Sequence, residues 1–169
     1  MKKFILILLI WVGVYIAFKT YWKMYEADAY YLESTRYLAV GDIEMAKKMI
    51  DKAIAGNPLE PNYYRGRAKV NIVDLSYSYG EVQKEIKDQA LLSLRKSYEL
   101  NPNNLVTIRN IIPLYYFIAI NDLKLSNGVG NLDERYFPLT KEFLEESKRK
   151  FSHDAGVVTL IAKYEKKLG

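Results

Sequence analysis

Few residues in this sequence have the types and spacing that catalysis needs. The single histidine, His153, lies between Ser152 and Asp154 in a segment typical of a turn. One histidine without any cysteine cannot assemble the ligand sets that zinc commonly takes. Glu145 and Glu146 are adjacent, so on a helix their carboxylates point to different faces and cannot share acid–base work. The sequence therefore predicts no catalytic residue and no metal site.

Nucleotide and nucleic-acid chemistry are equally poorly represented. The glycine turn Gly128-Val129-Gly130 lacks the lysine and the following helix of a phosphate-binding loop. A net charge of +5 is too small to favour nucleic acid as a partner. Half of the residues are hydrophobic and none is cysteine, which is typical of a chain that folds without disulfides. We expect a non-enzymatic binding protein without a cofactor.

Tyrosine is unusually frequent, with fifteen copies. Several occur as close pairs, which are Tyr30-Tyr31, Tyr63-Tyr64, Tyr77/Tyr79 and Tyr115-Tyr116. Because neighbours on a helix point about 100° apart, one member of a pair can pack in the core while the other faces a groove. Exposed tyrosines anchor peptides at a low entropic cost and also stack on sugar rings. We predict a groove-facing partner patch at Tyr31, Tyr63, Arg65 and Arg67, with aromatic packing between helices as the alternative.

The elements that would position these residues begin with an apolar N-terminal segment. The residues from Phe4 to Phe18 carry no charge and follow two lysines. With the next four residues the run reaches about nineteen, close to the ~20 that a helix needs to cross the hydrocarbon core. The sequence predicts a transmembrane helix over residues 4–22, within an anchor at 1–22. Because lysines and aromatic rings favour the headgroup region, its interface residues are Lys19, Tyr21, Trp22 and Lys23.

A secretory signal peptide is the alternative for this segment. Ala27-Asp28-Ala29 has the small-x-small form of a cleavage site, but it lies about ten residues beyond the apolar run, which favours an uncleaved anchor. The lysines near the N-terminus favour a cytoplasmic N-terminus through the positive-inside rule. We therefore expect a single-pass membrane protein whose remaining chain is extracytoplasmic. Cleavage would instead give a secreted protein.

A complete amphipathic helix follows at residues 42–55. Asp42 is a good N-cap residue, and Glu44 suits the positive end of the helix dipole. Its apolar stripe consists of Ala46, Met49, Ile50, Ala53 and Ile54. We expect Gly56 to end the helix in the left-handed conformation, because Pro58 cannot continue it.

Further helices are predicted on both sides of this one. The anchor should continue without a break to Val40, with Tyr30, Thr35, Tyr37 and Leu38 facing inward. Helix 61–78 should bury Tyr64, Ala68, Ile72 and Leu75, and helix 81–99 should bury Val82, Ile86, Ala90, Leu94 and Tyr98. A helix capped by Asn103 should run to Asn121, with residues 111–120 apolar on every side and therefore central in the array.

The C-terminal part should close the array. Residues 124–132 should form a flexible loop, because the run 126–131 is rich in Ser, Asn and Gly. Pro138 should open a helix that runs to Phe151. The last helix, 155–168, has an inward stripe and a polar outer face, as a terminal cap requires. The stripe consists of Val157, Leu160, Ile161, Tyr164 and Leu168.

The spacing of small residues resembles the tetratricopeptide repeat, a 34-residue helix pair. The matching positions are Ala46, Ile50, Ala53 and Pro58 in one copy and Ala90, Leu94, Ser97 and Pro102 in a second. Tyr30 and Tyr37 match the large aromatic positions of the first helix, whereas Glu33 and Ser34 depart from the pattern. The copies are 44 residues apart, so the chain between Ala68 and Ala90 should be lengthened.

This resemblance implies an all-α superhelix over residues 23–169, with roughly three helical hairpins and a C-terminal capping helix. A second likeness covers about residues 1–68, where an apolar span leads into repeat helices. That order is similar to the C-terminal part of bacterial membrane proteins of the O-antigen ligase and polymerase class. It implies envelope glycan biology, but the chain lacks the many spans and the large loop that carry ligase activity.

Three functions remain open from these observations. The preferred hypothesis is a scaffold at the bacterial cell envelope that binds a protein or peptide partner, which can itself be a membrane protein. The second is an accessory module of envelope glycan assembly. The third is a structural protein that self-associates, since the ends of repeat arrays can stack head to tail.

Overall fold

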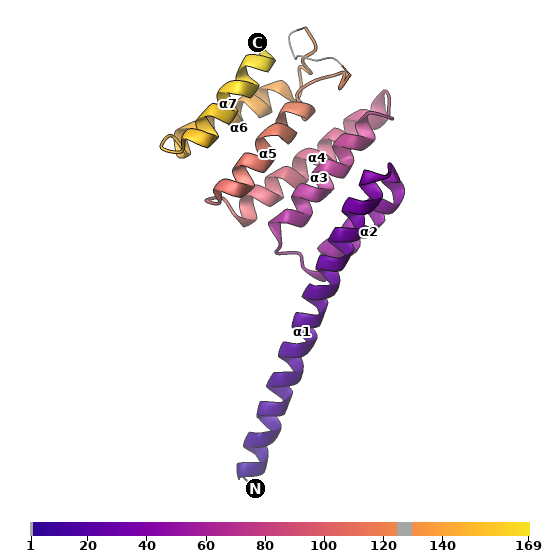
Figure 1. Ribbon diagram of the computed structural model, residues 1–169, viewed down its shortest axis with the longest axis vertical. Coiled ribbons are helices and arrows are strands. Elements are labelled where there is room, and N and C mark those ends of the chain that lie inside the picture. Colours follow the sequence, from indigo (N-terminus) through magenta and orange to yellow (C-terminus); the bar gives the residue numbers. More distant parts are fainter. Residues whose placement is uncertain (1, 125–129) are drawn as a thin grey trace. The chain divides into compact units, whose positions relative to one another are not determined.

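The computed structural model describes residues 2–124 and 130–169, and in these residues it contains seven α-helices (Figure 1). The helices are α1 (Lys2–Ala39), α2 (Ile43–Gly56), α3 (Pro61–Leu75), α4 (Glu81–Leu100), α5 (Leu105–Ile118), α6 (Phe137–Lys150) and α7 (Ala155–Leu168). The predicted all-α class is confirmed. The chain divides into two compact units, Met1–Leu59 and Glu60–Gly169. The anchor boundary expected at residue 22 is not a structural break, because α1 passes through it.

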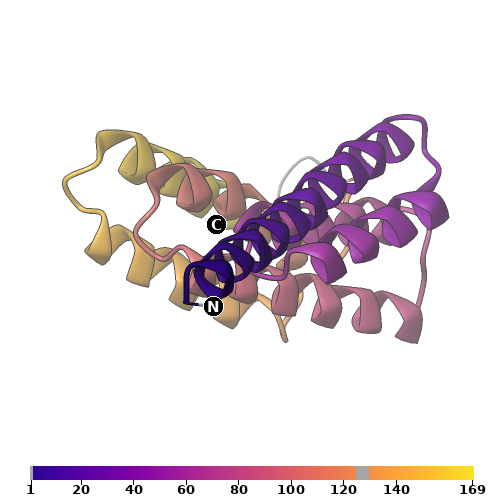
Figure 2. The same ribbon diagram turned by 90° about the horizontal axis from the view of Figure 1, so that it is seen from below.

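The first unit pairs α2 with the C-terminal part of α1 (Figures 1 and 2). Helix α1 is continuous from the apolar segment to Ala39, as predicted. Its buried residues are Ala27 and Ser34, which are seven positions apart and therefore share one face. The predicted inward position of Thr35 is wrong: its side chain is exposed, because it points about 100° away from Ser34. Tyr30, Tyr37 and Leu38 flank the buried face and are half-buried.

Helix α2 begins as its sequence predicts. The side chain of Asp42 accepts a hydrogen bond of 3.0 Å from the backbone N–H of Met45. This bond satisfies one of the N–H groups that the first turn of a helix leaves unpaired. The stripe of Ala46, Met49, Ile50 and Ala53 is buried, and Ile54 is half-buried. The hydroxyl of Ser34 donates a 2.8 Å hydrogen bond to the carbonyl of Ala46, which ties the two helices together.

The expected left-handed conformation of Gly56 is wrong. The structure places Gly56 as the last residue of α2, and its φ is not among the positive values. A Cβ atom at this position would lie 2.9 Å from the Cβ of Ala27 and 3.5 Å from the carbonyl oxygen of Lys23. Glycine is therefore required because the backbones of α1 and α2 approach closely here. The helix stops because Pro58 follows, as the sequence indicated.

Gly56→Ala should destabilise the first unit. Overpacking a tight contact costs about 1–3 kcal/mol, whereas alanine gains only about 1 kcal/mol over glycine as a helix residue. Thermal unfolding of the full chain in detergent, followed by circular dichroism, would measure the change. The double variant Ala27→Gly/Gly56→Ala should recover stability through relief of the clash. If Gly56→Ala instead raised the unfolding temperature, the close contact would not be limiting.

The second unit is built around α5, which contacts α3, α4, α6 and α7. Residues 111–120 are the centre of its core, as predicted, because a segment that is apolar on every side needs partners on every side. The N-cap is Asn104 rather than the predicted Asn103, and its side chain accepts a hydrogen bond of 2.9 Å from the N–H of Thr107. The helix also ends at Ile118, earlier than the predicted Asn121. Beyond its end, the backbone N–H of Asn121 donates a hydrogen bond to the carbonyl of Asn131.

The hairpin of α3 and α4 differs from prediction at its edges. Helix α3 ends at Leu75, three residues earlier than expected. Ile86, Ala90 and Leu94 are buried, but Val82 is 56% exposed and its predicted inward position is wrong. Steps of four residues advance about 40° around a helix with 3.6 residues per turn, so a stripe built only of such steps leaves the buried face at its ends.

The long separation of the two repeat-like stripes is accommodated by α4 and the turn before it. Helix α4 has 20 residues, whereas α2 has 14. The extra residues lie at the start of α4, since it begins nine positions before Ala90 while α2 begins three positions before Ala46. The six additional residues of α4 therefore lie between Ala68 and Ala90.

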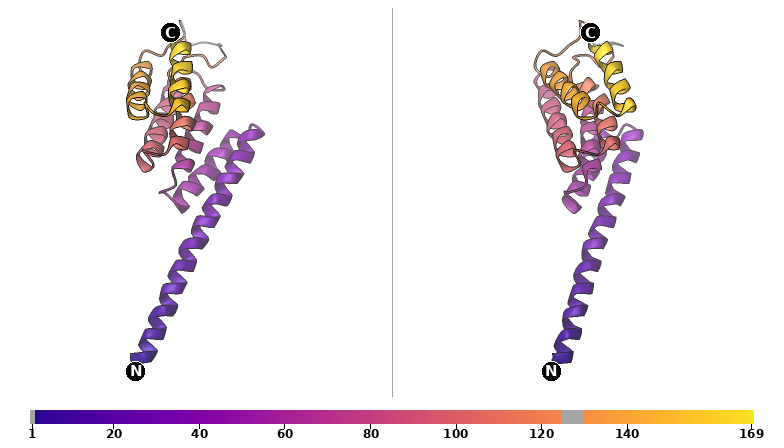
Figure 3. Two further views of the ribbon diagram at one scale, coloured as in Figure 1. Left: turned by 60° about the vertical axis from the view of Figure 1, so that its left-hand side comes forward. Right: turned by 90° about the vertical axis from the view of Figure 1, so that its left-hand side faces the viewer.

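The C-terminal helices form as predicted (Figure 3). Pro138 is the second residue of α6, where its missing N–H leaves no helix bond unmade. In α7 the inward residues Val157, Ile161, Tyr164 and Leu168 are buried and Leu160 is half-buried. Of the loop predicted at residues 124–132, residues 125–129 lie outside the described residues.

Candidate functional site

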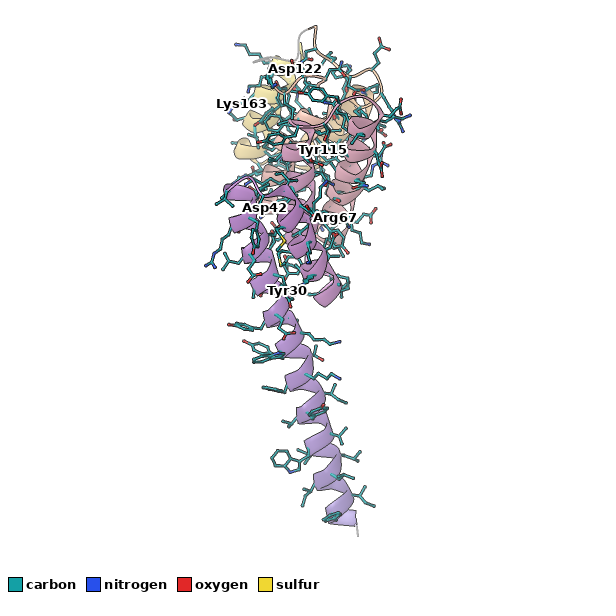
Figure 4. The ribbon with its side chains drawn as sticks, turned by 90° about the vertical axis from the view of Figure 1, so that its right-hand side faces the viewer. Tyr30, Asp42, Arg67, Tyr115, Asp122 and Lys163 are labelled. Carbon is teal, nitrogen blue, oxygen red and sulfur yellow. The ribbon has the colours of Figure 1, made fainter. Side chains whose placement is uncertain are left out.

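The largest exposed apolar surface in the first unit is the N-terminal part of α1. Every described side chain from Phe4 to Glu26 is exposed (Figure 4). Among the described residues, α1 is the one helix long and apolar enough to cross a membrane, and none of its apolar window is buried by protein. A soluble helix would bury such a surface, because exposed apolar patches of this size are unfavourable in water. The segment is long and apolar enough to span a membrane or to be a signal sequence.

Aromatic rings form a ladder where this apolar segment ends. The rings of Phe18 and Trp22 have centroids 6.2 Å apart, and those of Trp22 and Tyr25 are 5.9 Å apart. The indole N–H of Trp22 donates a hydrogen bond of 2.8 Å to the carboxylate of Glu26, the first acidic residue in the sequence. An apolar ring with a satisfied polar atom suits the membrane interface. All four predicted interface residues, Lys19, Tyr21, Trp22 and Lys23, are exposed.

The hydroxyl of Thr20 is also satisfied within the helix. It donates a hydrogen bond of 2.9 Å to the carbonyl of Ile16, one turn earlier in the helix. A threonine that bonds its own helix in this way leaves no unpaired polar group toward lipid. The polar atoms of this part of α1 are therefore compatible with the edge of a bilayer.

The predicted partner patch is divided between the two units. Tyr31 lies on α1 and is half-buried, whereas Tyr63, Arg65 and Arg67 lie on α3. Residues two positions apart on a helix do not face each other, so Arg65 and Arg67 point to different sides. The groove-facing role of Tyr63 is wrong, because its side chain is only 1% exposed. Tyr63 shares a face with Val70, seven residues on, which is equally buried.

The most exposed tyrosines of the second unit lie elsewhere, in the turn between α3 and α4. Tyr77 is 68% exposed and Tyr79 is 76% exposed. Tyr79 lines a hollow of about 300 Å³ that also reaches Gln83 and Asn121. A second hollow of about 350 Å³ shares Gln83 and Asn121 with the first. We name this region, with its two tyrosines and adjoining hollows, the turn surface.

Sequence reasoning recognised the Tyr77/Tyr79 pair but did not place it in the partner patch. The available signal was its position between Ser76 and Gly80, which favours a turn over a helix. A tyrosine in a turn cannot join the apolar stripe of a helix, so its ring is left to solvent or to a partner. The turn surface combines such rings with concave surroundings of mixed polarity.

Lys87 is buried beside the turn surface and was not predicted as a site residue. Its side chain is 4% exposed. Its ammonium donates a hydrogen bond of 2.6 Å to the carboxylate of Asp133 and one of 2.8 Å to the carbonyl of Ile120. The ammonium also lies 5.3 Å from the ring centroid of Tyr136. Lys87 thus holds the end of α5 and the start of the segment that leads to α6 against α4. A buried lysine survives only with such partners.

Tyr136 makes a second polar contact with α4. Its hydroxyl lies 2.9 Å from the carboxylate of Asp88 and 3.1 Å from the carbonyl of Lys84, to which it can donate. Burial raises the pKa of the Tyr136 hydroxyl, and the acceptor Asp88 raises it further. The hydroxyl therefore stays protonated and acts as a donor at neutral pH. Arg135 adds an exposed ion pair with Asp88 at 3.2 Å.

The turn before α7 carries the lone histidine and an ion pair. His153 and Ser152 are exposed. Asp154 is the N-cap of α7, and its side chain accepts a hydrogen bond of 2.7 Å from the N–H of Val157. The guanidinium of Arg109 lies 2.8 Å from Asp154 and holds the pKa of this carboxyl below its usual range, together with the Val157 bond. These contacts are structural. In the described part of the chain, no group of three or more His, Cys, Asp or Glu residues could hold a metal ion.

Lys87→Met should strongly destabilise the second unit. It leaves the carboxylate of Asp133, 19% exposed, without its cation, and breaking one side of a buried pair costs about 3–5 kcal/mol. Lys84→Met is the matched control one turn earlier. Its ammonium is 52% exposed and 3.7 Å from Glu81, so its loss should cost at most about 1 kcal/mol. Denaturant unfolding of the full chain in detergent compares the two, and equal effects would contradict the structural role of Lys87.

Comparison with known proteins adds no relative: no protein-family model matches this chain, and no curated protein matches it.

Proposed function

We propose that this chain is a membrane-anchored scaffold that binds a protein partner at the bacterial cell envelope. The observation that carries the proposal is the exposed apolar surface of α1, which continues as one helix into a folded helical hairpin. In this proposal residues 4–22 cross the bilayer, the N-terminus is cytoplasmic and the helical array is extracytoplasmic. The array presents surfaces to a partner and carries out no chemistry.

A tetratricopeptide-like superhelix is the proposed form of the array. Its support is the equal burial of equally spaced residues in two helices. Ala46, Ile50 and Ala53 in α2 and Ala90, Leu94 and Ser97 in α4 are all at most 1% exposed. The small residues of this set, the three alanines and Ser97, allow close helix contact. The hydroxyl of Ser97 also donates a hydrogen bond of 2.9 Å to the carbonyl of Pro61. Repeat arrays of this kind commonly bind peptides and proteins on extended surfaces.

An uncleaved anchor is favoured over a signal peptide by the surroundings of the candidate cleavage site. Ala27 is fully buried and contacts Gly56, and residues 27–29 lie inside α1. Cleavage after Ala29 would remove a buried residue of the hairpin and cut a helix that packs against α2. The retained segment is therefore part of the fold as well as the anchor.

The anchor and its orientation are tested together on protein expressed with its own N-terminus. We expect the intact mass of the full chain, and digestion by added protease only when the extracytoplasmic face of sealed vesicles is accessible. A mass that begins after Ala29 would instead identify a secreted protein. Digestion only from the cytoplasmic face would contradict the proposed orientation.

The turn surface is the proposed contact with the partner. A photo-crosslinking amino acid at Tyr79 should give one discrete product in native membranes, and Tyr77→Ala with Tyr79→Ala should weaken binding of the identified partner by about 2 kcal/mol or more, as truncating interface tyrosines does. A crosslinker at Val106, which is 63% exposed on α5, is the matched control. A second position at Arg65 examines the patch predicted from the sequence. If neither Tyr79 nor Arg65 gave a product, the scaffold proposal would be contradicted.

A further inference from the structure

The close contact at Gly56 fixes the height of the α2–α3 connection relative to the membrane anchor. Gly56 packs on Ala27 and on the backbone of Lys23. Lys23 directly follows Trp22, the centre of the aromatic ladder. With a rise of about 1.5 Å per residue, the level of residues 23–27 lies within roughly 8 Å of Trp22 along α1. The C-terminal end of α2 therefore returns to the level of the membrane interface.

The residues after Gly56 are suited to contact a bilayer. Pro58 is exposed, and the side chain of Leu59 is 74% exposed, although it is a large aliphatic group. No acidic residue occurs between Gly56 and Leu59. Lys23 provides an exposed basic side chain at the same end of the hairpin, while the ammonium of Lys52, one turn before Gly56, lies 5.0 Å from the ring centroid of Tyr30. Apolar insertion next to basic groups is the usual chemistry of a protein segment that lies in the interface of a membrane.

The opposite end of the same hairpin provides the contrast. Val40 lies in the turn between α1 and α2 and is 79% exposed, slightly more than Leu59. It is separated from Trp22 by eighteen positions of the chain, or about 27 Å along a helix. Exposure alone therefore does not distinguish the two aliphatic residues. The difference is that Leu59 follows three positions after Gly56, which packs on α1 near the aromatic ladder, whereas Val40 lies far along α1 from it.

We infer that the turn at residues 57–59 is a second membrane contact, in which Leu59 inserts into the boundary between headgroups and acyl chains beside Trp22. This inference rests on the proposed membrane anchor. The bilayer then holds the hairpin at two points, through α1 and through the turn, so that the tilt of α1 and α2 relative to the membrane is restricted. The inferred partner of Leu59 is the phospholipid interface.

Fluorescence quenching by lipid tests this contact in the full chain, reconstituted into phosphatidylcholine vesicles with shallow brominated acyl chains. Three variants carry one tryptophan each: Trp22 alone, Leu59→Trp and Val40→Trp, with the other native tryptophans replaced by phenylalanine. We expect blue-shifted and quenched emission from Trp22 and from Leu59→Trp, and unshifted, unquenched emission from Val40→Trp. Quenching of Trp22 alone would overturn the second contact and leave the anchor intact. Loss of quenching at Trp22 as well would overturn the anchor itself.

A second measurement uses the absence of native cysteine. Leu59→Cys and Val40→Cys are smaller changes at exposed positions, so they test the same point without a bulky ring. A water-soluble, membrane-impermeant maleimide should label Val40→Cys in vesicles much faster than Leu59→Cys, and the two rates should become similar when the chain is unfolded in denaturant. Equal rates in vesicles would overturn the inference.

Discussion

The first unit depends on the continuity of α1, which meets the rule that a backbone in hydrocarbon must satisfy its own hydrogen bonds. A single chain segment meets this rule only as a continuous helix. Helix α1 obeys it through the apolar segment and then continues for more than a further dozen residues in the region that pairs with α2. Because no loop separates the two regions, the aromatic ladder at Trp22 and the buried face at Ala27 have a fixed separation. A flexible linker would lose this relation.

The second unit uses a different principle, in which an apolar helix is enclosed and polar contacts secure its surroundings. Helix α5 supplies the centre of the core, and the stacked rings of Tyr115 and Phe143, 3.9 Å apart, join it to α6. Lys87 and Tyr136 then connect α4 to the segments on either side of residues 125–129. Hydrophobic burial is not directional, whereas a buried ammonium demands particular acceptors. These polar contacts therefore select one path of the chain over alternatives with similar burial.

Much of the helical pattern could be predicted from the sequence because its signals are local. Asp42 caps α2, residues 111–120 lie in the core, and α7 buries the expected stripe. These features follow from side chains a few positions apart. Gly56 shows the limit, since a glycine before a proline indicates the end of a helix whether its cause is a left-handed turn or a close helix contact. Only the position of Ala27, far away in sequence, distinguishes these causes.

The candidate surfaces were harder to predict than the helices for a related reason. Periodicity assigns one buried face to a helix, but α3 buries Tyr63 and Val70 in addition to Ala68, Ile72 and Leu75. The pair Tyr63-Tyr64 alone therefore does not reveal which of its two rings is buried. Lys87 was missed because its acceptors lie 33 and 46 residues away along the chain.

Short turns provide the exception, since they cannot bury side chains along a regular stripe. Their aromatic and aliphatic residues are left for the surroundings to cover, and what covers them depends on where the turn is held. Tyr79 lines a hollow of mixed polarity, and here the proposed partner is a protein. Leu59 follows three positions after Gly56, which packs on α1 next to the aromatic ladder, and here the inferred partner is a bilayer.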